Sequence, residues 1–247
     1  MLYITGDTHG DQEEWARFID PFLKPDDMLV IAGDFGVGFW DGRMWSEETF
    51  YDWLETCPYT VLFVDGNHED FNKLYSCPVS EWNGGRVHKL RSNVIHLMRG
   101  EIFRIEGHTI FTFGGGYSID KSLRKEGFSW WPQELPSAEE YENAERNLTR
   151  FDFRVDHIIT HTAPQETLYY LTHMRSFGIR GDIPEDRELT TFLDTVRQRT
   201  EYTSWFFGHY HIDAEIWRGQ TALLHAVREL ASGKIVHWKQ PQSDIEQ

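Results

Sequence analysis

The sequence of 247 residues predicts a single domain of the α/β class, spanning residues 1–247. In its first third, short apolar runs alternate with amphipathic stretches, which is the pattern of parallel strands joined by helices. Hydrophobic residues make up 40% of the chain and aromatic residues 15%, which is enough apolar material for one sizeable core. Short polar patches follow several apolar runs, at the place where ligands converge in open α/β sheets. These three observations favour one α/β domain with a site at its strand ends.

The first third is predicted to contain three strands and two helices. The strand runs are short and apolar, as expected for strands buried in a parallel sheet. In the first helix, Trp15, Ile19 and Phe22 recur at helical spacing, which indicates a stripe that faces the core. The expected elements are a strand over residues 2–4, a helix over 11–23, a strand over 28–31, a helix over 46–56 and a strand over 61–64.

The middle of the chain changes character. Turn signals that contain glycine separate short strand-like runs, which favours a β-meander. A polar, aromatic insert over residues 117–150 follows, and we expect it to form a lid or a side wall. Its helix is predicted to begin at Ser137, where Glu140 completes a capping box. The remaining expected elements are strands over 94–97, 102–105, 109–113, 157–160, 204–207, 221–226 and 234–238, and a helix over 185–199.

The net charge and the hydropathy of the chain argue against binding to extended nucleic acid and against a membrane span. The chain carries 40 acidic and 24 basic residues, for a formal charge of -16, which disfavours binding to extended nucleic acid. Bound cations can neutralise carboxylates locally, so a small phosphorylated substrate remains compatible with this charge. No apolar run reaches the roughly 18 to 20 residues of a membrane span, and no signal-like stretch precedes the first strand. We therefore expect a cytoplasmic protein that does not enter membranes; the sequence carries no signature of its oligomeric state.

Five polar motifs contain side chains that can bind divalent metals. Carboxylate oxygens, amide oxygens and imidazole nitrogens are the ligands that hard and borderline divalent ions take. Each aspartate or asparagine alone would more often be a turn or a helix cap, but five motifs at the ends of strand-like runs favour one shared site. Flanking glycines allow the tight turns that direct successive side chains inward. The candidate ligands are Asp7, His9, Asp34, Asn67, His161, His209 and His211.

Other polar residues near these motifs are expected to be structural. Asp11 is predicted to cap the first helix, and Glu69 is predicted to brace its loop by hydrogen bonding. Seven of the 12 histidines receive no functional assignment, because a lone histidine is more often a packed or solvated group. These are His88, His96, His108, His157, His173, His225 and His237.

The motifs Asp-x-His, Gly-Asp, Gly-Asn-His-Glu, Thr-His and Gly-His-x-His, in this order from Asp7 to His211, resemble those of the calcineurin-like metallophosphoesterase superfamily. The resemblance covers nearly the whole chain. It implies a four-layer α/β/β/α sandwich, in which two mixed β-sheets are flanked by helices, with a centre of two divalent metals at one edge. Mn, Fe and Zn are the metals we expect first, and the sequence does not determine which is bound.

The resemblance also divides the candidate ligands between two metals. One ligand reaches both ions, the others reach one each, and a hydroxide shares the gap between the ions. In-line attack of this hydroxide on phosphorus needs no covalent phospho-enzyme. Asp7, His9 and His211 would hold the first metal, Asn67, His161 and His209 would hold the second, and Asp34 would bridge them.

His68 matches the histidine of the superfamily that does not bind metal. By this resemblance it is a catalytic residue, together with Asp34, and it stabilises the transition state or protonates the leaving alkoxide. Asp34 or Asp65 would lie close enough to orient its ring. We expect the loss of His68 to reduce turnover more than metal binding.

The insert carries residues that could bind a substrate. Lys121 and Arg124 lie close in the sequence to Tyr117 and Trp130, a mixture that can clamp a phosphate oxygen and stack on a planar group. The alternative is a solvated basic turn over a tryptophan-rich packing patch, and the sequence does not separate the two. A second cationic rim is offered by Arg175 and Arg180.

The motifs predict a phosphoesterase without fixing its substrate. Gly33-Asp34 continues into Phe35 and Gly36, so the arginine that follows this motif in serine/threonine protein phosphatases is missing, although Gly-Asn-His-Glu resembles those phosphatases. We therefore predict a dinuclear metal-dependent hydrolase of a phosphomonoester or a small phosphodiester. The alternatives are a nuclease-type phosphodiesterase that acts on nucleic acid and a non-catalytic scaffold that kept the fold.

Overall fold

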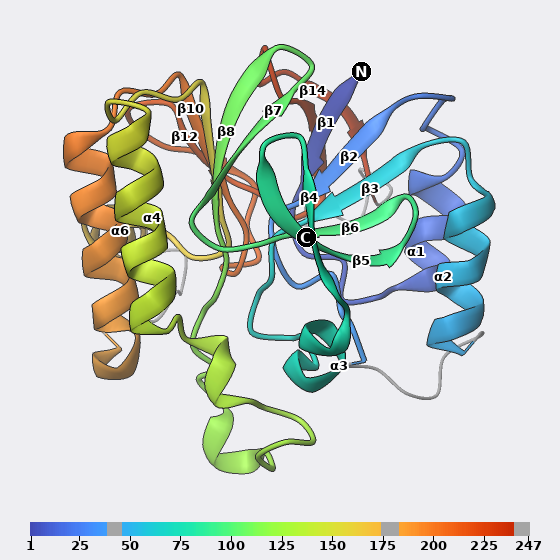
Figure 1. Cartoon of the computed structure of the whole chain (residues 1–247), viewed down its shortest axis with the longest axis horizontal. Coiled ribbons are helices and arrows are strands. Elements are labelled where there is room, and N and C mark those ends of the chain that lie inside the picture. The colour runs from blue at the N-terminus through green and yellow to red at the C-terminus, as the bar shows by residue number, and fades with distance from the viewer. Residues whose placement is uncertain (39–45, 174–182, 240–247) are drawn as a thin grey trace.

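The computed structural model describes residues 1–38, 46–173 and 183–239. It contains two mixed β-sheets that pack face to face, with helices on both outer faces (Figure 1). This arrangement confirms the four-layer α/β/β/α sandwich predicted from the sequence. Both sheets take strands from widely separated parts of the chain. Among the described residues, no helix is long and apolar enough to cross a membrane.

The first sheet contains β1 (Leu2–Thr5), β2 (Met28–Ile31), β3 (Thr60–Phe63), β4 (Val79–Trp82), β5 (Gly85–Arg91), β6 (Val94–Leu97), β13 (Ala226–Glu229) and β14 (Ile235–Trp238). Their order across the sheet is β14-β13-β1-β2-β3-β6-β5-β4. The central strands β1, β2, β3 and β6 run parallel to one another, and the outer pairs are antiparallel. The central strands therefore end at one edge of the sheet.

The second sheet contains β7 (Glu101–Ile105), β8 (His108–Phe113), β9 (His157–Thr160), β10 (Ser204–Phe207), β11 (Ala214–Glu215) and β12 (Gln220–Ala222). Their order is β11-β12-β10-β9-β8-β7. The strands β8, β9, β10 and β12 are parallel, whereas β7 and β11 pair antiparallel at the two edges. The loops that follow β9 and β10 meet those that follow β1, β2 and β3, because residues of all five loops lie in contact.

Strands buried on both faces account for the continuous apolar runs in the sequence. In β2, Val30 packs between the two sheets, while Leu29 and Ile31 pack against the helices on the outer face. In β10, Phe206 packs between the sheets and Trp205 faces the opposite helical layer. Side chains alternate between the faces of a strand, so a strand covered on both sides has no polar face.

Helices cover the outer face of each sheet (Figure 1). The first sheet packs against α1 (Gln12–Glu14), the π-helix η1 (Trp15–Ile19), α2 (Glu47–Thr56) and α3 (Phe71–Ser76). The second sheet packs against α4 (Ala138–Arg150), α5 (Gln165–His173) and α6 (Arg187–Arg199). Short 3-10 helices are η2 (Lys121–Leu123), η3 (Pro132–Glu134) and η4 (Pro184–Asp186).

Local capping signals in the sequence are confirmed. Asp11 accepts hydrogen bonds from the backbone N–H groups of Glu13 and Glu14 and thereby caps α1. The capping box of Ser137 and Glu140 is formed at the start of α4. The first helix differs from the prediction over 11–23, because it changes to π-helical hydrogen bonding at Trp15 and ends at Ile19.

The strand predicted over residues 221–226 is wrong. This stretch contains the end of β12 in one sheet and the start of β13 in the other, so the chain crosses between the sheets within it. The Asp213 carboxylate accepts the backbone N–H groups of Leu224, His225 and Ala226. These N–H groups bond to a side chain instead of a neighbouring strand, which is why the ladder is broken there.

The insert predicted over residues 117–150 consists of two different parts. Its helix α4 packs against β7 in the outer helical layer and buries Asn143, Ala144 and Leu148. The part before α4 contains only short 3-10 turns and extends beyond the ends of the sheets (Figure 1). Only this first part is placed where a lid or side wall could act. Arg175 and Arg180, the second cationic rim of the sequence prediction, lie outside the described residues.

Candidate metal centre

All seven candidate ligands lie on loops that follow the carboxyl ends of five parallel strands. Asp7 and His9 follow β1, Asp34 follows β2 and Asn67 follows β3, while His161 follows β9 and both His209 and His211 follow β10. The two sheets bring these loops together at one edge of the sandwich. Three overlapping groups of them could each hold a metal ion, and His68 belongs to one of these groups.

The first group consists of Asp7, His9 and His211. Asp7 Oδ2 lies 3.2 Å from His211 Nε2 and 4.0 Å from His9 Nε2, and the two imidazole nitrogens are 3.2 Å apart. Asp7 is buried, whereas the His211 side chain is 55% exposed. A site formed by these atoms would open toward solvent.

The second group is centred on His161, which is fully buried. Its Nδ1 lies 2.9 Å from the Ala32 carbonyl oxygen and donates to it, so Nε2 of the neutral ring carries a lone pair. That Nε2 faces Asn67 Oδ1 at 3.1 Å, His209 Nδ1 at 3.2 Å and Asp34 Oδ1 at 3.4 Å. His161 Nε2, Asn67 Oδ1 and Asp34 Oδ1 therefore face one another as acceptors. A divalent cation fits this set of donor atoms, because it supplies the positive charge that the lone pairs face.

Asp34 lies between the two groups. Its Oδ1 is the oxygen 3.4 Å from His161 Nε2, and its Oδ2 is 3.7 Å from His9 Nδ1. Burial acts to raise the pKa of Asp34, but the nearby imidazoles of His161, His68 and His9 outweigh burial and hold that pKa below its usual value. The carboxylate is thus ionised at neutral pH and faces both groups, as a bridging ligand must.

Burial lowers the pKa of three imidazoles at the centre, those of His9, His68 and His209, whereas the hydrogen bond with Asp7 raises the pKa of His211. Burial, together with a smaller effect of the neighbouring His161, lowers the pKa of His209 to about 3. Burial is also the main reason that the pKa of His68 is lowered to about 4, with His9 and Arg124 adding to the effect. Neutral imidazole is the form that binds metals, so the electrostatic environment favours ligation.

Backbone conformation at the centre is unusual. Asp34, His9, His209 and His211 all have positive φ, at 51°, 47°, 67° and 52°. Residues other than glycine adopt this left-handed region at a cost of about 1 kcal/mol or more, and such residues cluster at functional sites. In the Gly-His-x-His motif these conformations direct His209 toward His161 and His211 toward Asp7 and His9.

Glycine is required where two loops approach most closely. Gly33 has a φ of 93°, and a Cβ atom at this position would overlap the His161 ring. A Cβ atom at Gly66 would overlap the Asp34 carboxylate. Both positions therefore exclude any side chain, which explains why glycine precedes two of the polar motifs.

His68 contacts His9 and Asp34, with which it forms one of the three sets that could hold a metal ion. Its Nδ1 is 3.2 Å from His9 Nδ1 and 3.9 Å from Asp34 Oδ2, and its Nε2 is 2.8 Å from Arg124 Nη2. Arg124 donates this hydrogen bond, since a guanidinium has no acceptor. The backbone N–H of His68 also donates to Asp34 Oδ1 at 2.8 Å. The Arg124 contact connects the insert directly to the predicted catalytic histidine.

The Asp65 carboxylate pairs with His96 and Arg99 and does not orient His68. Its Oδ1 lies 3.0 Å from His96 Nε2, and its Oδ2 accepts from Arg99 Nε at 2.9 Å. His96 in turn lies 3.0 Å from His88 through their Nδ1 atoms. Of the two carboxylates considered for His68, Asp34 is the one that faces it, while Asp65 joins a buried network on the other side of the loop.

Two buried residues hold the ligand loops in place. The Glu69 carboxylate accepts the backbone N–H groups of Phe35 at 2.8 Å, Gly36 at 3.0 Å and Val37 at 2.6 Å, which confirms its predicted bracing role. The Lys239 ammonium donates to the carbonyl oxygen of Asp7 at 2.6 Å. Sequence reasoning missed Lys239, because a lysine near the end of a strand carries no pattern that indicates burial.

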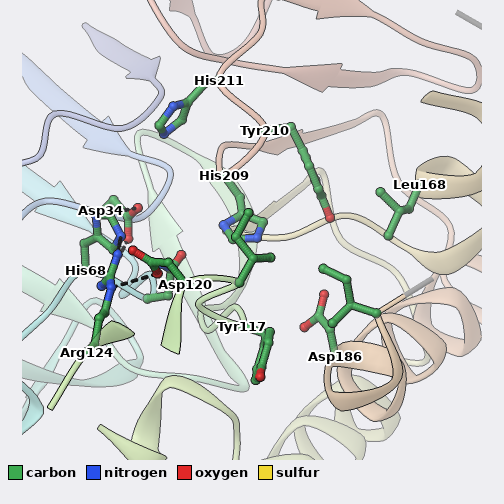
Figure 2. A pocket seen from close by; sticks show the side chains of 13 residues that line it. Asp34, His68, Tyr117, Asp120, Arg124, Leu168, Asp186, His209, Tyr210 and His211 are labelled. Carbon is green, nitrogen blue, oxygen red and sulfur yellow. Dashed lines mark hydrogen bonds and ion pairs between the residues drawn. The ribbon is translucent and has the colours of Figure 1, made fainter. Parts of the chain in front are cut away.

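A pocket of about 500 Å³ opens beside the candidate ligands (Figure 2). Tyr117 and Arg124, two of the four predicted substrate-binding residues, line it. The described lining does not include the other two, Lys121 and Trp130. Instead, the Lys121 ammonium lies 3.8 Å from the centre of the Trp130 ring and stabilises the insert internally.

The sequence pattern of the calcineurin-like phosphoesterase family matches residues 2–213, which include every candidate ligand. The chain belongs to the calcineurin-like phosphoesterase family. This is a family of metal-dependent phosphoesterases that use two metal ions, and the clustered Asp and His side chains of this chain could bind metal.

Two curated relatives of this phosphoesterase are lariat debranching enzymes. The chain is 27% identical to that of Gallus gallus over 179 residues, which are 67% of this chain and 31% of that protein. It is 23% identical to that of Danio rerio over 236 residues, which are 85% of this chain and 40% of that protein. The phosphoesterase thus spans less than half the length of either relative. The expectation that it does not act on nucleic acid receives no support from these relatives.

We predict that Glu69→Gln destabilises this phosphoesterase by about 2 to 4 kcal/mol, because one acceptor oxygen is replaced by an NH₂ group that faces backbone N–H donors. Chemical denaturation of the metal-free protein would measure the loss. The metal content after reloading should also fall, since the loop of Asp34 loses its brace. Glu142→Gln, at an exposed position of α4, is the matched control, and equal stability of the two variants would contradict the bracing role.

Proposed function

We propose that the centre is a dinuclear metal site with the ligand division implied by the family resemblance. Asp7, His9 and His211 hold one ion, Asn67, His161 and His209 hold the other, and Asp34 reaches both. The observation that carries this proposal is the convergence of acceptor atoms on His161 Nε2, for which a cation is the matching partner. Two bound divalent ions supply an acidified water and polarise the phosphoryl oxygens of an ester. Each ligand type that the family resemblance requires is present, which argues against a non-catalytic scaffold.

His68 is the proposed acid or transition-state stabiliser. Its ring is neutral at neutral pH and its Nε2 points toward the pocket, where it accepts a hydrogen bond from Arg124. When a phosphate group binds, its oxygens compete for the Arg124 guanidinium. Release of that contact leaves the lone pair of His68 Nε2 free to take a proton from water and pass it to the oxygen of the leaving alcohol.

Arg124 is the proposed phosphate-binding residue of the insert. Asp120 Oδ1 lies 2.7 Å from its Nε, and the Ser129 carbonyl oxygen accepts from its Nη1 at 3.2 Å, so the side chain is held toward the pocket (Figure 2). Guanidinium groups bind phosphate through paired N–H donors. This chain lacks the arginine that follows the Gly-Asp motif in serine/threonine protein phosphatases, and Arg124 supplies this charge from a different segment of the chain.

The substrate proposed is a phosphomonoester or a small phosphodiester. The names of the two relatives favour a second candidate, a phosphodiesterase that acts on nucleic acid. The formal charge of -16 opposes long-range attraction of a polyanion. The two candidates differ in a measurable way, because the second predicts salt-dependent binding to nucleic acid.

We expect Asp34→Asn and His68→Ala to separate metal binding from catalysis. Asp34→Asn should abolish activity and lower the metal content, because the bridging charge is lost. His68→Ala should lower kcat by about 100- to 10,000-fold while both metals remain bound. Metal content by elemental analysis and turnover of a nitrophenyl ester would be measured on the same samples. Full activity in either variant would overturn the assignment of the site.

Arg124→Met should lower kcat/KM by about 10- to 100-fold, the value of a charge-assisted hydrogen bond to phosphate. The methionine keeps much of the side-chain length, so packing of the insert is largely retained. Lys125→Met, at the neighbouring exposed cation, is the matched control and should change kcat/KM little. Equal effects of the two substitutions would indicate general electrostatic attraction rather than a specific contact.

The class of ester can be determined with two chromogenic substrates. The purified protein, reloaded with manganese, would be given a nitrophenyl phosphomonoester and a bis-nitrophenyl phosphodiester at neutral to mildly alkaline pH. We expect hydrolysis of at least one of them. Preference for the monoester supports a phosphatase of small metabolites, and preference for the diester supports the phosphodiesterase candidate. Hydrolysis of neither, with two metals bound, would contradict the proposed function.

A further inference from the structure

The wall of the pocket opposite Asp34 and His68 carries a buried carboxylate, that of Asp186 (Figure 2). Asp186 is only 3% exposed, and among the described residues its Oδ1 has no hydrogen-bond partner. Figure 2 shows the carboxylate pointing toward the middle of the pocket. A buried polar atom without a partner is rare in folded proteins and calls for an explanation.

Helix capping does not account for this carboxylate. Asp186 occupies the N-cap position of α6, where aspartate is favoured because its side chain accepts the backbone N–H groups of the first turn. Here the side chain makes no such capping bond. The side chain is therefore directed away from the helix end that would ordinarily satisfy it.

The surroundings of Asp186 make its charge costly. Leu168, Ile183 and the ring of Tyr210 line the same side of the pocket. Burial raises the pKa of Asp186 to about 6, and only the imidazole of His161 opposes this rise. A carboxylate kept in such a place is stabilised when a ligand donates a hydrogen bond to it.

We propose that Asp186 accepts a hydrogen bond from a hydroxyl or amino group on the alcohol portion of the substrate. This inference rests on the proposed function, and it names the chemical class of the ester. The phosphate would lie on the side of Asp34 and Arg124, and the alcohol portion would extend across the pocket to Asp186. The two ends of the pocket then complement the two ends of one molecule.

Charge decides which substituents this side of the pocket accepts. An ionised Asp186 repels a second phosphate, and its apolar neighbours in the described lining of the pocket, Leu168 and Ile183, carry no charge that would offset the repulsion. A hydroxyl donates a neutral hydrogen bond, and a protonated amine adds an opposite charge. Esters that carry either donor on the alcohol are therefore preferred over plain alkyl esters and over molecules with a second phosphate at that end.

The test compares three alkyl phosphates that differ in one group. Propyl phosphate, 3-hydroxypropyl phosphate and 3-aminopropyl phosphate would inhibit hydrolysis of whichever nitrophenyl ester the manganese-loaded wild-type protein cleaves. We expect the hydroxyl or the amino compound to inhibit about 10- to 100-fold more strongly than propyl phosphate. The stronger of the two identifies the donor as a hydroxyl or an amine. Equal inhibition constants for all three compounds would overturn the proposal.

Two substitutions at Asp186 test whether this side chain causes the stronger inhibition by the hydroxyl or amino compound. In Asp186→Leu the preference over propyl phosphate should vanish, and in the isosteric Asp186→Asn it should shrink, because the amide oxygen is a weaker acceptor. Glu185→Gln, at the exposed carboxylate one residue earlier, should keep the wild-type preference. A preference that survives in Asp186→Leu would show that another group recognises the donor.

Thermal unfolding separates recognition from a structural role and from failure of the proposed function. Both Asp186 variants should unfold at or above the wild-type temperature at neutral pH, since a costly buried charge is removed. A marked loss of stability with unchanged inhibition would make Asp186 a structural residue.

Stabilisation of the metal-loaded protein by the three phosphates gives a readout without turnover. If no ester is hydrolysed but the Asp186-dependent difference in stabilisation remains, the binding site stands and the proposed reaction fails. If neither is observed, both fail.

Discussion

Hydrogen-bond acceptors that face one another without protons govern the organisation of this protein. His161 Nδ1 donates a hydrogen bond to the Ala32 carbonyl oxygen, so Nε2 of the neutral ring is an acceptor. This nitrogen faces the side-chain oxygens of Asn67 and Asp34, which are acceptors as well. This arrangement is unfavourable in a buried place unless a cation lies among the atoms. The fold nevertheless enforces it, because the ligand loops are anchored to strands of two sheets whose apolar faces pack together. Packing energy far from the site thus holds a constellation that would otherwise separate.

The residues around the centre fix its atoms rather than add ligands. Ser118 accepts from Asn67 Nδ2 at 3.1 Å, which directs the amide oxygen toward His161. Glu69 fixes three consecutive N–H groups after Asp34, and Lys239 fixes the carbonyl oxygen of Asp7. The ligand loops also contain residues with positive φ, such as Asp34 and His209, and glycines whose replacement would cause a clash, such as Gly33 and Gly66. These backbone conformations allow the loops to approach one another closely. Such preorganisation is needed because a metal site tolerates only small errors in ligand position.

The candidate ligands could be found from the sequence because each lies a few residues after a strand whose apolar run is visible. The cap at Asp11 was also predictable, since its partners lie two and three residues further along the chain, and the bracing role of Glu69 was expected without its partners, which lie 32 to 34 residues away. Ser118, Lys239 and Asp186 were not, because their partners lie 51 or more residues away or are absent from the described chain. The strand predicted over 221–226 was wrong for a related reason: a side chain from outside the run, Asp213, breaks it.

The pocket also constrains how a larger substrate could bind. Arg124 and the candidate metal ligands provide positive or acceptor groups on one side, while Asp186 provides an unpaired negative charge on the other. A phosphate chain that continued past Asp186 would meet this charge at close range, where little water screens it. A nucleic acid would therefore have to extend away on the side of Arg124 and place only a sugar or base near Asp186. The charges that line the pocket thus restrict the direction in which a bound nucleic acid can extend. The net charge of the protein affects only how readily the two molecules meet.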